Sequence, residues 1–489
     1  MNDRRDFLKL IGAAAAYGTL STPVPGITAS VASTSTRFPG KRPPPSQRKF
    51  MSPAVERELA RVKSKIGDPK LAWLFENCYP NTLDTTVHTG TFDGKPDTFI
   101  VTGDIDAMWL RDSSAQVWPY LPLAAHDDAL RRLCRGLIHR HARCIAIDPY
   151  ANAFMADSHA RTNLPWAQHD DTEMKPGVAE RKWEIDSLCW TIRLAHGYWK
   201  ATGDRVPFDD DWRAAMRLVP RTFRTQQRKH GPGPYHFQRA AAAPTDTLAL
   251  GGYGWPARSV GLIFSMFRPS DDACKYPLFV PGNAFAVVSL RQLAAMVREL
   301  FADESFARDC EALASEVEAA LQQYGLMHDA QGHTFWAYEV DGYGNQLFMD
   351  DANVPSLLSL PCLGCCQRDD ARYRTTRALA WSDRNPYFFS GKAAQGIGGP
   401  HEGLRMVWPM SIMIRALTSD DAGEIRQCLH WLKTTDANTG FMHEAFDQDD
   451  PSHFTRAWFA WANSLFGEMI IDLAKREPRL LKSPSDPKA

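Results

Sequence analysis

The sequence has almost no excess charge of either sign. Its 489 residues include 56 Lys and Arg against 57 Asp and Glu, a net charge of −1. Nucleic-acid and anionic-membrane binders usually carry a positive excess. We therefore expect no nucleic-acid partner. With 44% apolar and 23% charged residues, the composition is that of an ordinary globular protein.

Long hydrophobic runs are also lacking. The one apolar run near the start, 10–20, is about a dozen residues long, too short to cross a hydrocarbon core of about 30 Å. It follows Arg4 and Arg5 and resembles a twin-arginine signal peptide. We expect a leader over residues 1–36, a periplasmic or secreted protein, and no integral membrane segment in the mature chain.

Cysteine is too sparse for a disulfide framework, with ten residues over this length. The cluster of Cys362, Cys365 and Cys366 lacks the fourth ligand and the second pair that a zinc site needs. We expect free thiols. Residues 37–50 are rich in proline and predict an exposed linker, 51–475 a catalytic domain, and 476–489 a polar tail.

Strand-like alternation is scarce, apart from a hairpin predicted over 333–346 around Asp341 and Gly342. Helical periodicity is common, as in 306–321, where apolar residues recur every three or four positions. This pattern predicts an all-α fold. Further helices are predicted at 55–66, 129–143, 183–200, 211–224, 290–300, 354–360, 370–381, 404–417, 422–432 and 454–473.

Four loop clusters carry the chemistry. The first, 103–113, holds three carboxylates, an arginine and a tryptophan. A pyranose needs this mixture, because charged groups bind its hydroxyls and an aromatic ring covers its C–H face. The alternative is a helix cap at Asp112 or Ser113, with Arg111 paired locally.

The second cluster, 181–190, places Glu184 and Asp186 at a helix start, where acids are favoured by the helix dipole in any case. Helical spacing of two residues points them to different faces. We therefore expect at most one of them to face a site.

The third cluster, 267–276, contains Asp271 and Asp272 between Arg268 and Lys275. The cations could neutralise one carboxylate and leave the pKa of the other free to rise, which suits a general acid. The alternative is a turn or a cap.

The fourth cluster, 440–447, sets Glu444 among apolar and aromatic neighbours, which desolvate a carboxylate and make it a better base. The alternative pairs Glu444 with Arg456 or His443. Both can hold together.

Together the four clusters resemble glycoside hydrolase family 125, the metal-independent exo-α-1,6-mannosidases. The resemblance covers residues 74–473 and rests on GDIDAMWLRDSSAQVWPY, KWEIDSLCW, FRPSDDACKY and GFMHEAF. It implies an (α/α)6 barrel with long loops around a cavity, a mannose-containing oligosaccharide or N-glycan substrate, and no metal or other cofactor. The Ala- and Pro-rich stretch 231–247 departs from the pattern and could alter linkage preference.

The resemblance also implies inversion at the anomeric carbon, with Asp271 or its neighbour Asp272 as the acid and Glu444 as the base. Inversion requires the two carboxyl groups to be about 6.5–9.5 Å apart. Alternatives are another inverting α-glycosidase, a sugar phosphorylase, or a non-catalytic periplasmic sugar-binding protein. The expected substrate contacts are Asp104, Asp106, Trp109, Arg111, Asp112, Asp186, Arg268, Asp272, His401 and His443.

Overall fold

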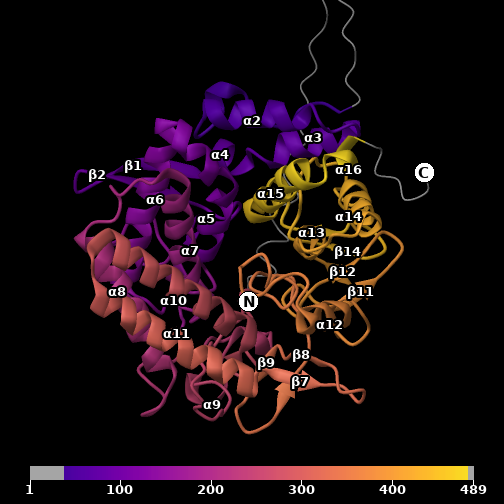
Figure 1. The fold of residues 1–489 in the computed structure, drawn as a ribbon. Coiled ribbons are helices and arrows are strands. Elements are labelled where there is room, and N and C mark those ends of the chain that lie inside the picture. Colours follow the sequence, from indigo (N-terminus) through magenta and orange to yellow (C-terminus); the bar gives the residue numbers. More distant parts are fainter. Residues whose placement is uncertain (1–37, 483–489) are drawn as a thin grey trace, which may run out of the picture.

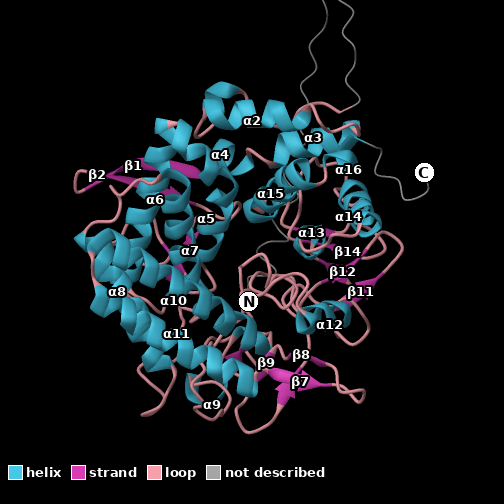
Figure 2. Cartoon of the chain, viewed as in Figure 1, coloured by secondary structure: helices cyan, strands magenta, loops and turns pink. Residues whose placement is uncertain are grey.

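The computed structural model describes residues 38–482. The predicted leader, 1–36, lies outside these residues. Figure 1 shows the helices arranged in a ring, with the first helices of the chain beside the last ones. The predicted all-α class is therefore confirmed, and the strands in Figure 2 are short.

The inner wall of the ring is formed by five helices that contact one another in sequence. Helix α5 neighbours α7 and α15, α7 neighbours α10, and α13 neighbours α15. Most of their residues are buried because they face both the ring interior and the outer helices. The inner helices are α5 (Leu110–Val117), α7 (Ile185–Thr202), α10 (Val280–Phe301), α13 (Pro409–Leu417) and α15 (Ala460–Arg476).

Amphipathic helices form the outer layer. On α11 the apolar stripe from Phe306 to Leu321 is buried, and this helix packs along α10. Its N-cap, Asp303, accepts a hydrogen bond from the amide of Phe306. The outer and shorter helices are α2 (Pro53–Lys63), α3 (Pro69–Cys78), α4 (Asn81–Thr85), α6 (Asp128–Ile147), α8 (Asp210–Gln226), α9 (Ala249–Gly252), α11 (Glu304–Tyr324), α12 (Ala371–Ala380), α14 (Ala422–Thr434) and α16 (Pro478–Lys482), with 3-10 turns at Pro45–Gln47, Trp118–His126 and Pro244–Asp246.

Short strands precede the inner helices and join their N-terminal ends. Strand β3 leads into α5 and β5 precedes α7, and both pair with β4. Strands β13 and β15 precede α13 and α15 and share β14, whereas β6 leads into α10. Pairing fixes these helix starts relative to one another. The strands of these sheets are β3 (Met108–Trp109), β4 (Ala153–Phe154), β5 (Val178–Glu180), β6 (Leu278–Phe279), β9 (Glu339–Val340), β10 (Gln346–Leu347), β13 (Met406–Val407), β14 (Ala445–Asp447) and β15 (Phe454–Thr455).

The predicted hairpin is present at its turn, where β9 pairs antiparallel with β10 and Gly342 adopts a positive φ of 74°. The first part of the predicted range pairs elsewhere, as β8 with β7. The remaining two-stranded sheets are β1 (Val87–Phe92) with β2 (Lys95–Ile100), β7 (Leu326–His328) with β8 (Thr334–Trp336), and β11 (Phe388–Ser390) with β12 (Gln395–Ile397).

The helix predicted at 354–360 is wrong, because the chain forms buried turns there. Both carboxylate oxygens of Asp350 accept backbone amides, from Leu357 and Leu358, at 2.7 and 2.9 Å. Side-chain acceptors here compete with helical hydrogen bonding. Helices predicted from 404 and 454 begin later, at Pro409 and Ala460, because short strands precede them.

Both ends of the described chain pack more closely than predicted. Most of 38–50 is exposed, yet Arg42 pairs with Glu56 at 2.5 Å and with Asp84 at 2.7 Å. The segment 476–489, expected to be a polar tail, begins with α16, whose Leu480 and Leu481 are buried. These two leucines provide the apolar contact that a free tail would lack.

Two other expectations concern apolar runs and thiols. Helix α10 has the length and composition of a membrane span, which the sequence analysis missed, but 72% of its most apolar window is buried inside the protein.

All ten cysteines are free thiols, and most are buried. Among the described residues, none of them belongs to a metal-ligand cluster.

Candidate active site

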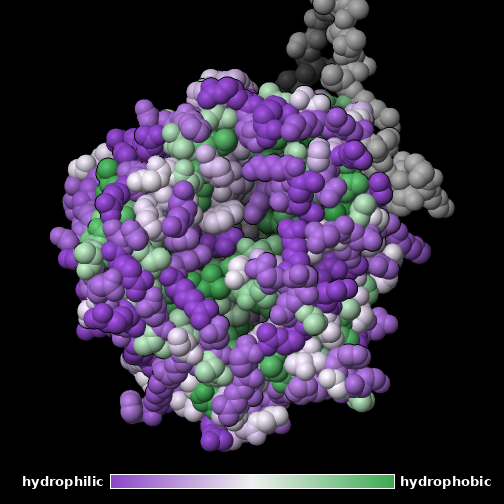
Figure 3. Space-filling view, viewed as in Figure 1, coloured by the Kyte–Doolittle hydropathy of each residue, from purple (hydrophilic) through white to green (hydrophobic). Residues whose placement is uncertain are grey.

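A cavity with about 330 Å³ of empty space lies where the segments before the inner helices meet. Asp271 and Glu444, which are far apart in sequence, both line it. Figure 3 shows hydrophobic residues gathered around the centre of the ring on an otherwise hydrophilic face. The lining residues are Thr102, Trp109, Arg111, Asp112, Pro269, Ser270, Asp271, Asn353, His401, Trp408, Glu444, Arg456, Phe459 and Trp461.

Asp271 lies at a tight turn on one side of this cavity. Its backbone adopts a positive φ of 67°, which a side chain other than glycine rarely takes, and its amide donates to the Arg268 carbonyl at 2.9 Å. The Lys182 Nζ holds the carbonyl of Asp271 at 2.7 Å, and Asn152 Nδ2 donates to its Oδ1 at 3.2 Å. These contacts fix the direction of the carboxyl group.

Arg111 joins the first two clusters from below the cavity. Its Nη1 lies 2.5 Å from Glu184 Oε2 and 3.4 Å from Asp186 Oδ2. Neither acid lines the cavity, which agrees with the expectation that at most one of them faces the site, although Arg111 contacts both. Glu184 is the extended N-cap residue of α7, so helical spacing does not apply to it.

Burial dominates the electrostatics of these two carboxyl groups. It raises the pKa of Glu184 well above its ordinary value, with Arg111 opposing and Asp271 reinforcing the shift. Burial also raises the pKa of Asp186 to about 6, against the attraction of Arg111. Asp271 therefore lies close enough to Glu184 to disfavour its ionisation.

Glu444 lies just before β14 and lines the same cavity. Burial raises its pKa to about 8, Arg456 opposes this shift, and Glu402 reinforces it. Arg456 Nη1 is 3.3 Å from Glu444 Oε1, whereas Oε2 has no hydrogen-bond partner within the described chain. The predicted pairing with Arg456 is confirmed.

Several of the predicted substrate contacts do line the cavity. Thr102 Oγ1 donates to Asp112 at 2.7 Å, so this carboxylate is also positioned by the protein. Neither Asp112 nor Ser113 caps the helix, because α5 begins at Leu110 without a side-chain cap. The predicted residues that line the cavity are Trp109, Arg111, Asp112, Asp271, His401 and Glu444.

Three predicted contacts lie behind the lining residues. Asp104 accepts from Arg456 at 2.6 Å, and Asp186 lies behind Arg111. The neighbour of the predicted acid, Asp272, has its Oδ1 3.9 Å from His401 Nδ1. These residues can orient the groups that line the cavity. Their direct contact with a sugar stays a prediction.

The other three predicted contacts point elsewhere. Asp106 is exposed at the tip of a three-residue turn. Arg268 pairs with Glu339 at 2.6 Å, so it does not neutralise either aspartate as predicted. His443 is stacked on Phe454, because neighbouring residues of an extended chain face opposite sides and Glu444 faces the cavity.

The sequence analysis missed Thr102 and Trp408. Trp408 immediately precedes Pro409 at the start of α13. This position could have been searched, because the lining residues Trp109 and Phe459 also directly precede inner helices. Its indole lies edge-on to Phe459 at 6.2 Å, and its Nε1 has no partner within the described chain. Aromatic faces and polar edges of this kind suit the C–H faces and hydroxyls of a sugar.

The family model for metal-independent alpha-mannosidases (GH125) matches residues 68–471. A solved alpha mannosidase from Streptococcus pneumoniae, described as a non-productive substrate complex with alpha-1,6-mannobiose, is 39% identical. It aligns with a TM-score of 0.84, covering 88% of this chain and all of that one. Meiotically up-regulated gene 157 protein of Schizosaccharomyces pombe is 43% identical over 91% of this chain and 90% of its own length.

The fold and the carboxylate-lined cavity define an (α/α)6-barrel glycosidase, as predicted. The chain belongs to glycoside hydrolase family 125, the metal-independent alpha-mannosidases. One group of side chains at the cavity has the spacing of metal ligands, since donor atoms of His401, Glu402 and Glu444 lie within 4.8 Å of one another. These three side chains also interact electrostatically, since Glu402 raises and His401 lowers the pKa of Glu444.

Proposed function

We propose that this alpha-mannosidase is an exo-acting, inverting enzyme that removes non-reducing terminal α-1,6-linked mannose from glycans. One observation carries the proposal: Asp271 and Glu444 line the same cavity. The α-1,6-mannobiose complex of the Streptococcus pneumoniae relative supports the linkage. The walled cavity suits a chain end rather than the middle of a polymer.

In this mechanism the terminal mannose lies among the aromatic rings of the cavity, with Arg111 and Asp112 near its hydroxyls. Asp271 donates its proton to the glycosidic oxygen as the bond to the anomeric carbon breaks. Glu444 removes a proton from a water, whose oxygen attacks that carbon from the opposite face. The products are β-mannose and the shortened glycan; Asp271 is left ionised and Glu444 protonated, and exchange with solvent restores both.

The direct test follows hydrolysis of α-1,6-mannobiose by proton NMR, with chelator present and with or without phosphate. We expect β-mannose as the first product and no dependence on phosphate. Initial α-mannose would contradict inversion, mannose 1-phosphate would indicate a phosphorylase, and binding without turnover would indicate a sugar-binding protein. Parallel assays of α-1,2- and α-1,3-mannobiose test the linkage.

The acid is tested with two neighbouring substitutions. Asp271→Asn should slow hydrolysis of mannobiose by about 10²–10⁴-fold, but slow an aryl mannoside with a good leaving group much less, because that group needs little protonation. Asp272→Asn is the matched control. If only the control variant showed the leaving-group dependence, the acid would be Asp272.

We also propose that residues 1–36 direct export to the periplasm or beyond, through Arg4 and Arg5. The support is the sequence pattern alone. Replacing both arginines with lysine should retain the protein in the cytoplasm of a bacterial host, as measured by cell fractionation. Unchanged export would contradict the proposal.

A further inference from the structure

A second cavity lies beside the loop that carries Asp271. It is open to solvent, encloses about 1410 Å³ of empty space, and is formed by two segments, 244–256 and 273–276. The first segment overlaps the end of the Ala- and Pro-rich stretch noted in the sequence. We call this cavity the loop groove; it is lined by Pro244, Thr245, Thr247, Leu248, Ala249, Gly254, Trp255, Pro256, Ala273, Cys274, Lys275 and Tyr276.

The loop groove and the catalytic cavity share one wall. Asp271 lines the catalytic cavity, and the chain reaches the groove two residues later, at Ala273. The amide of Ala273 donates to the carbonyl of Thr245 at 2.7 Å, which joins the two segments of the groove. A general acid must lie beside the oxygen of the leaving group. The remainder of the glycan therefore leaves the catalytic cavity on the side where this loop lies.

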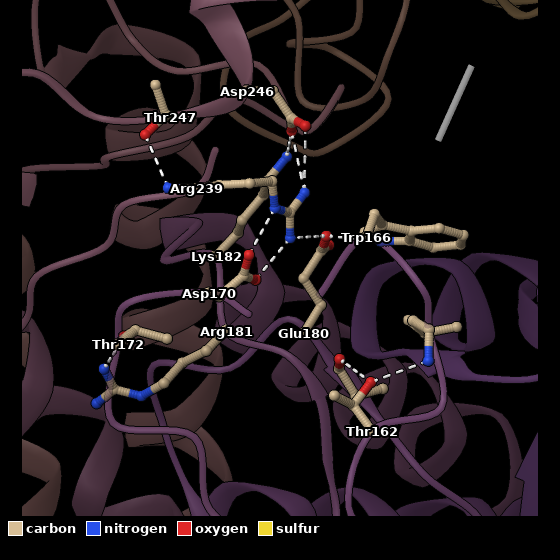
Figure 4. A network of polar contacts seen from close by, with 12 residues as sticks. Thr162, Trp166, Asp170, Thr172, Glu180, Arg181, Lys182, Arg239, Asp246 and Thr247 are labelled. Atoms are coloured by element: carbon tan, nitrogen blue, oxygen red, sulfur yellow. Dashed lines mark hydrogen bonds and ion pairs between the residues drawn. The ribbon is translucent and has the colours of Figure 1, made fainter. Parts of the chain in front are cut away.

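A buried ionic network holds this shared wall in place. Lys182 Nζ contacts Asp246 Oδ1 at 2.5 Å and the carbonyl of Asp271 at 2.7 Å, so one cation links both segments. Figure 4 shows Asp246 above the guanidinium of Arg239, whose own amide donates to Thr247 Oγ1 at 2.9 Å. The groove is thus fixed relative to the acid.

The lining of the groove has the chemistry of a sugar subsite. Trp255 is 53% exposed although it is large and apolar, and Tyr276 lies in the same lining. An exposed indole offers a flat face to the C–H face of a pyranose. Lys275, Thr245 and Thr247 supply hydrogen-bonding groups to the same lining for hydroxyls.

We propose that the loop groove binds sugar units on the leaving-group side of the glycan, with the Trp255 indole as the stacking surface. This inference rests on the proposed function, because it takes Asp271 as the acid. It predicts a preference for long over short substrates, set by a site outside the catalytic cavity.

The test compares Trp255→Ala with the wild type on α-1,6-linked manno-oligosaccharides from the disaccharide to the hexasaccharide. The variant should raise KM for the longer substrates by about 3- to 10-fold and leave mannobiose within twofold. Trp255→Phe should restore most of the loss. Tyr343→Ala is the matched control, because Tyr343 is an exposed aromatic residue outside the groove, and it should change nothing.

Three results would overturn the inference. The first is equal KM values for Trp255→Ala and the wild type at every substrate length. The second is a rise in KM for mannobiose as large as that for the longer substrates. The third is a rise in KM seen only with octyl mannoside, which would assign the groove to an apolar aglycone. If the wild type hydrolyses no mannoside, the proposed function fails separately. Titration of the hexasaccharide by calorimetry then decides the groove: weaker binding by Trp255→Ala supports it, and equal binding overturns it.

Discussion

The protein contains two neighbouring groups of charged residues that differ in how completely their carboxyl oxygens are hydrogen-bonded. The first, which we call the anchor network, contains Arg239, Lys182, Asp170, Glu180 and Asp246 (Figure 4). Each oxygen of its three carboxylates accepts a hydrogen bond from a side chain. Such complete pairing offsets the cost of burial and leaves no group free to react.

The second group surrounds the catalytic cavity and is incompletely paired. Glu444 Oε2, Asp186 Oδ1 and Asp272 Oδ2 lack a hydrogen-bond partner within the described chain. Burial raises the pKa of Glu444 to about 8 and that of Asp186 to about 6. Burial also raises the pKa of Asp170 in the anchor network to about 6, so the two groups differ in how completely their carboxyl oxygens are hydrogen-bonded and not in the direction of the pKa shift.

The largest expected effect is the loss of the base. Glu444→Gln keeps the shape of the side chain but cannot accept a proton, so kcat for mannobiose should fall by at least about 10³-fold. Mannose binding by calorimetry and the thermal midpoint should change little, because the Gln side-chain oxygen can still accept the hydrogen bond from Arg456. A variant that retained near-normal turnover would show that the base lies elsewhere.

Removing the central cation of the anchor network should act on stability instead. Arg239→Met leaves two buried carboxylates, of Asp170 and Glu180, and the partly buried carboxylate of Asp246 without their shared partner, so unfolding free energy should fall by about 3–5 kcal/mol. Urea unfolding measures this loss. If the variant were as stable as the wild type, the anchor network would not hold the loop of Asp271, and the contrast between the two groups would disappear.

Much of this contrast was beyond prediction from the sequence. Periodicity gave the helices and the family motifs gave Asp271 and Glu444, because both are local signals. Asp170, Glu180, Arg239 and Asp246 have no motif, since their pairing depends on four segments that only the fold brings together. The sequence likewise could not show that Arg268 pairs with Glu339, a partner 71 positions away.

Smaller effects are expected from two neighbours of Glu444, Glu402 and His401, which shift its pKa in opposite directions. Glu402 raises the pKa of Glu444, so Glu402→Gln should lower it. Because the base works only when ionised, the rise of kcat/KM with pH, which we expect near pH 8 in the wild type, should move to lower pH by about one unit.

The opposite substitution sharpens this test. His401 lowers the pKa of Glu444, so His401→Asn should move the same limb to higher pH. A pH profile of kcat/KM for each variant measures the direction of its shift. Shifts in the same direction for both variants, or none, would mean that Glu444 does not control the acidic limb.

The smallest expected effect comes from an exposed ion pair. Arg291 Nη2 lies 2.6 Å from Glu318 Oε2, as close as many contacts of the anchor network, but both side chains are about half exposed. Water and salt weaken such a pair, and Arg291→Ala should cost about 0.5 kcal/mol of unfolding free energy. Measured beside Arg239→Met, it tests whether burial rather than distance sets the energy of an arginine–carboxylate contact. Equal losses from the two substitutions would mean that distance alone decides.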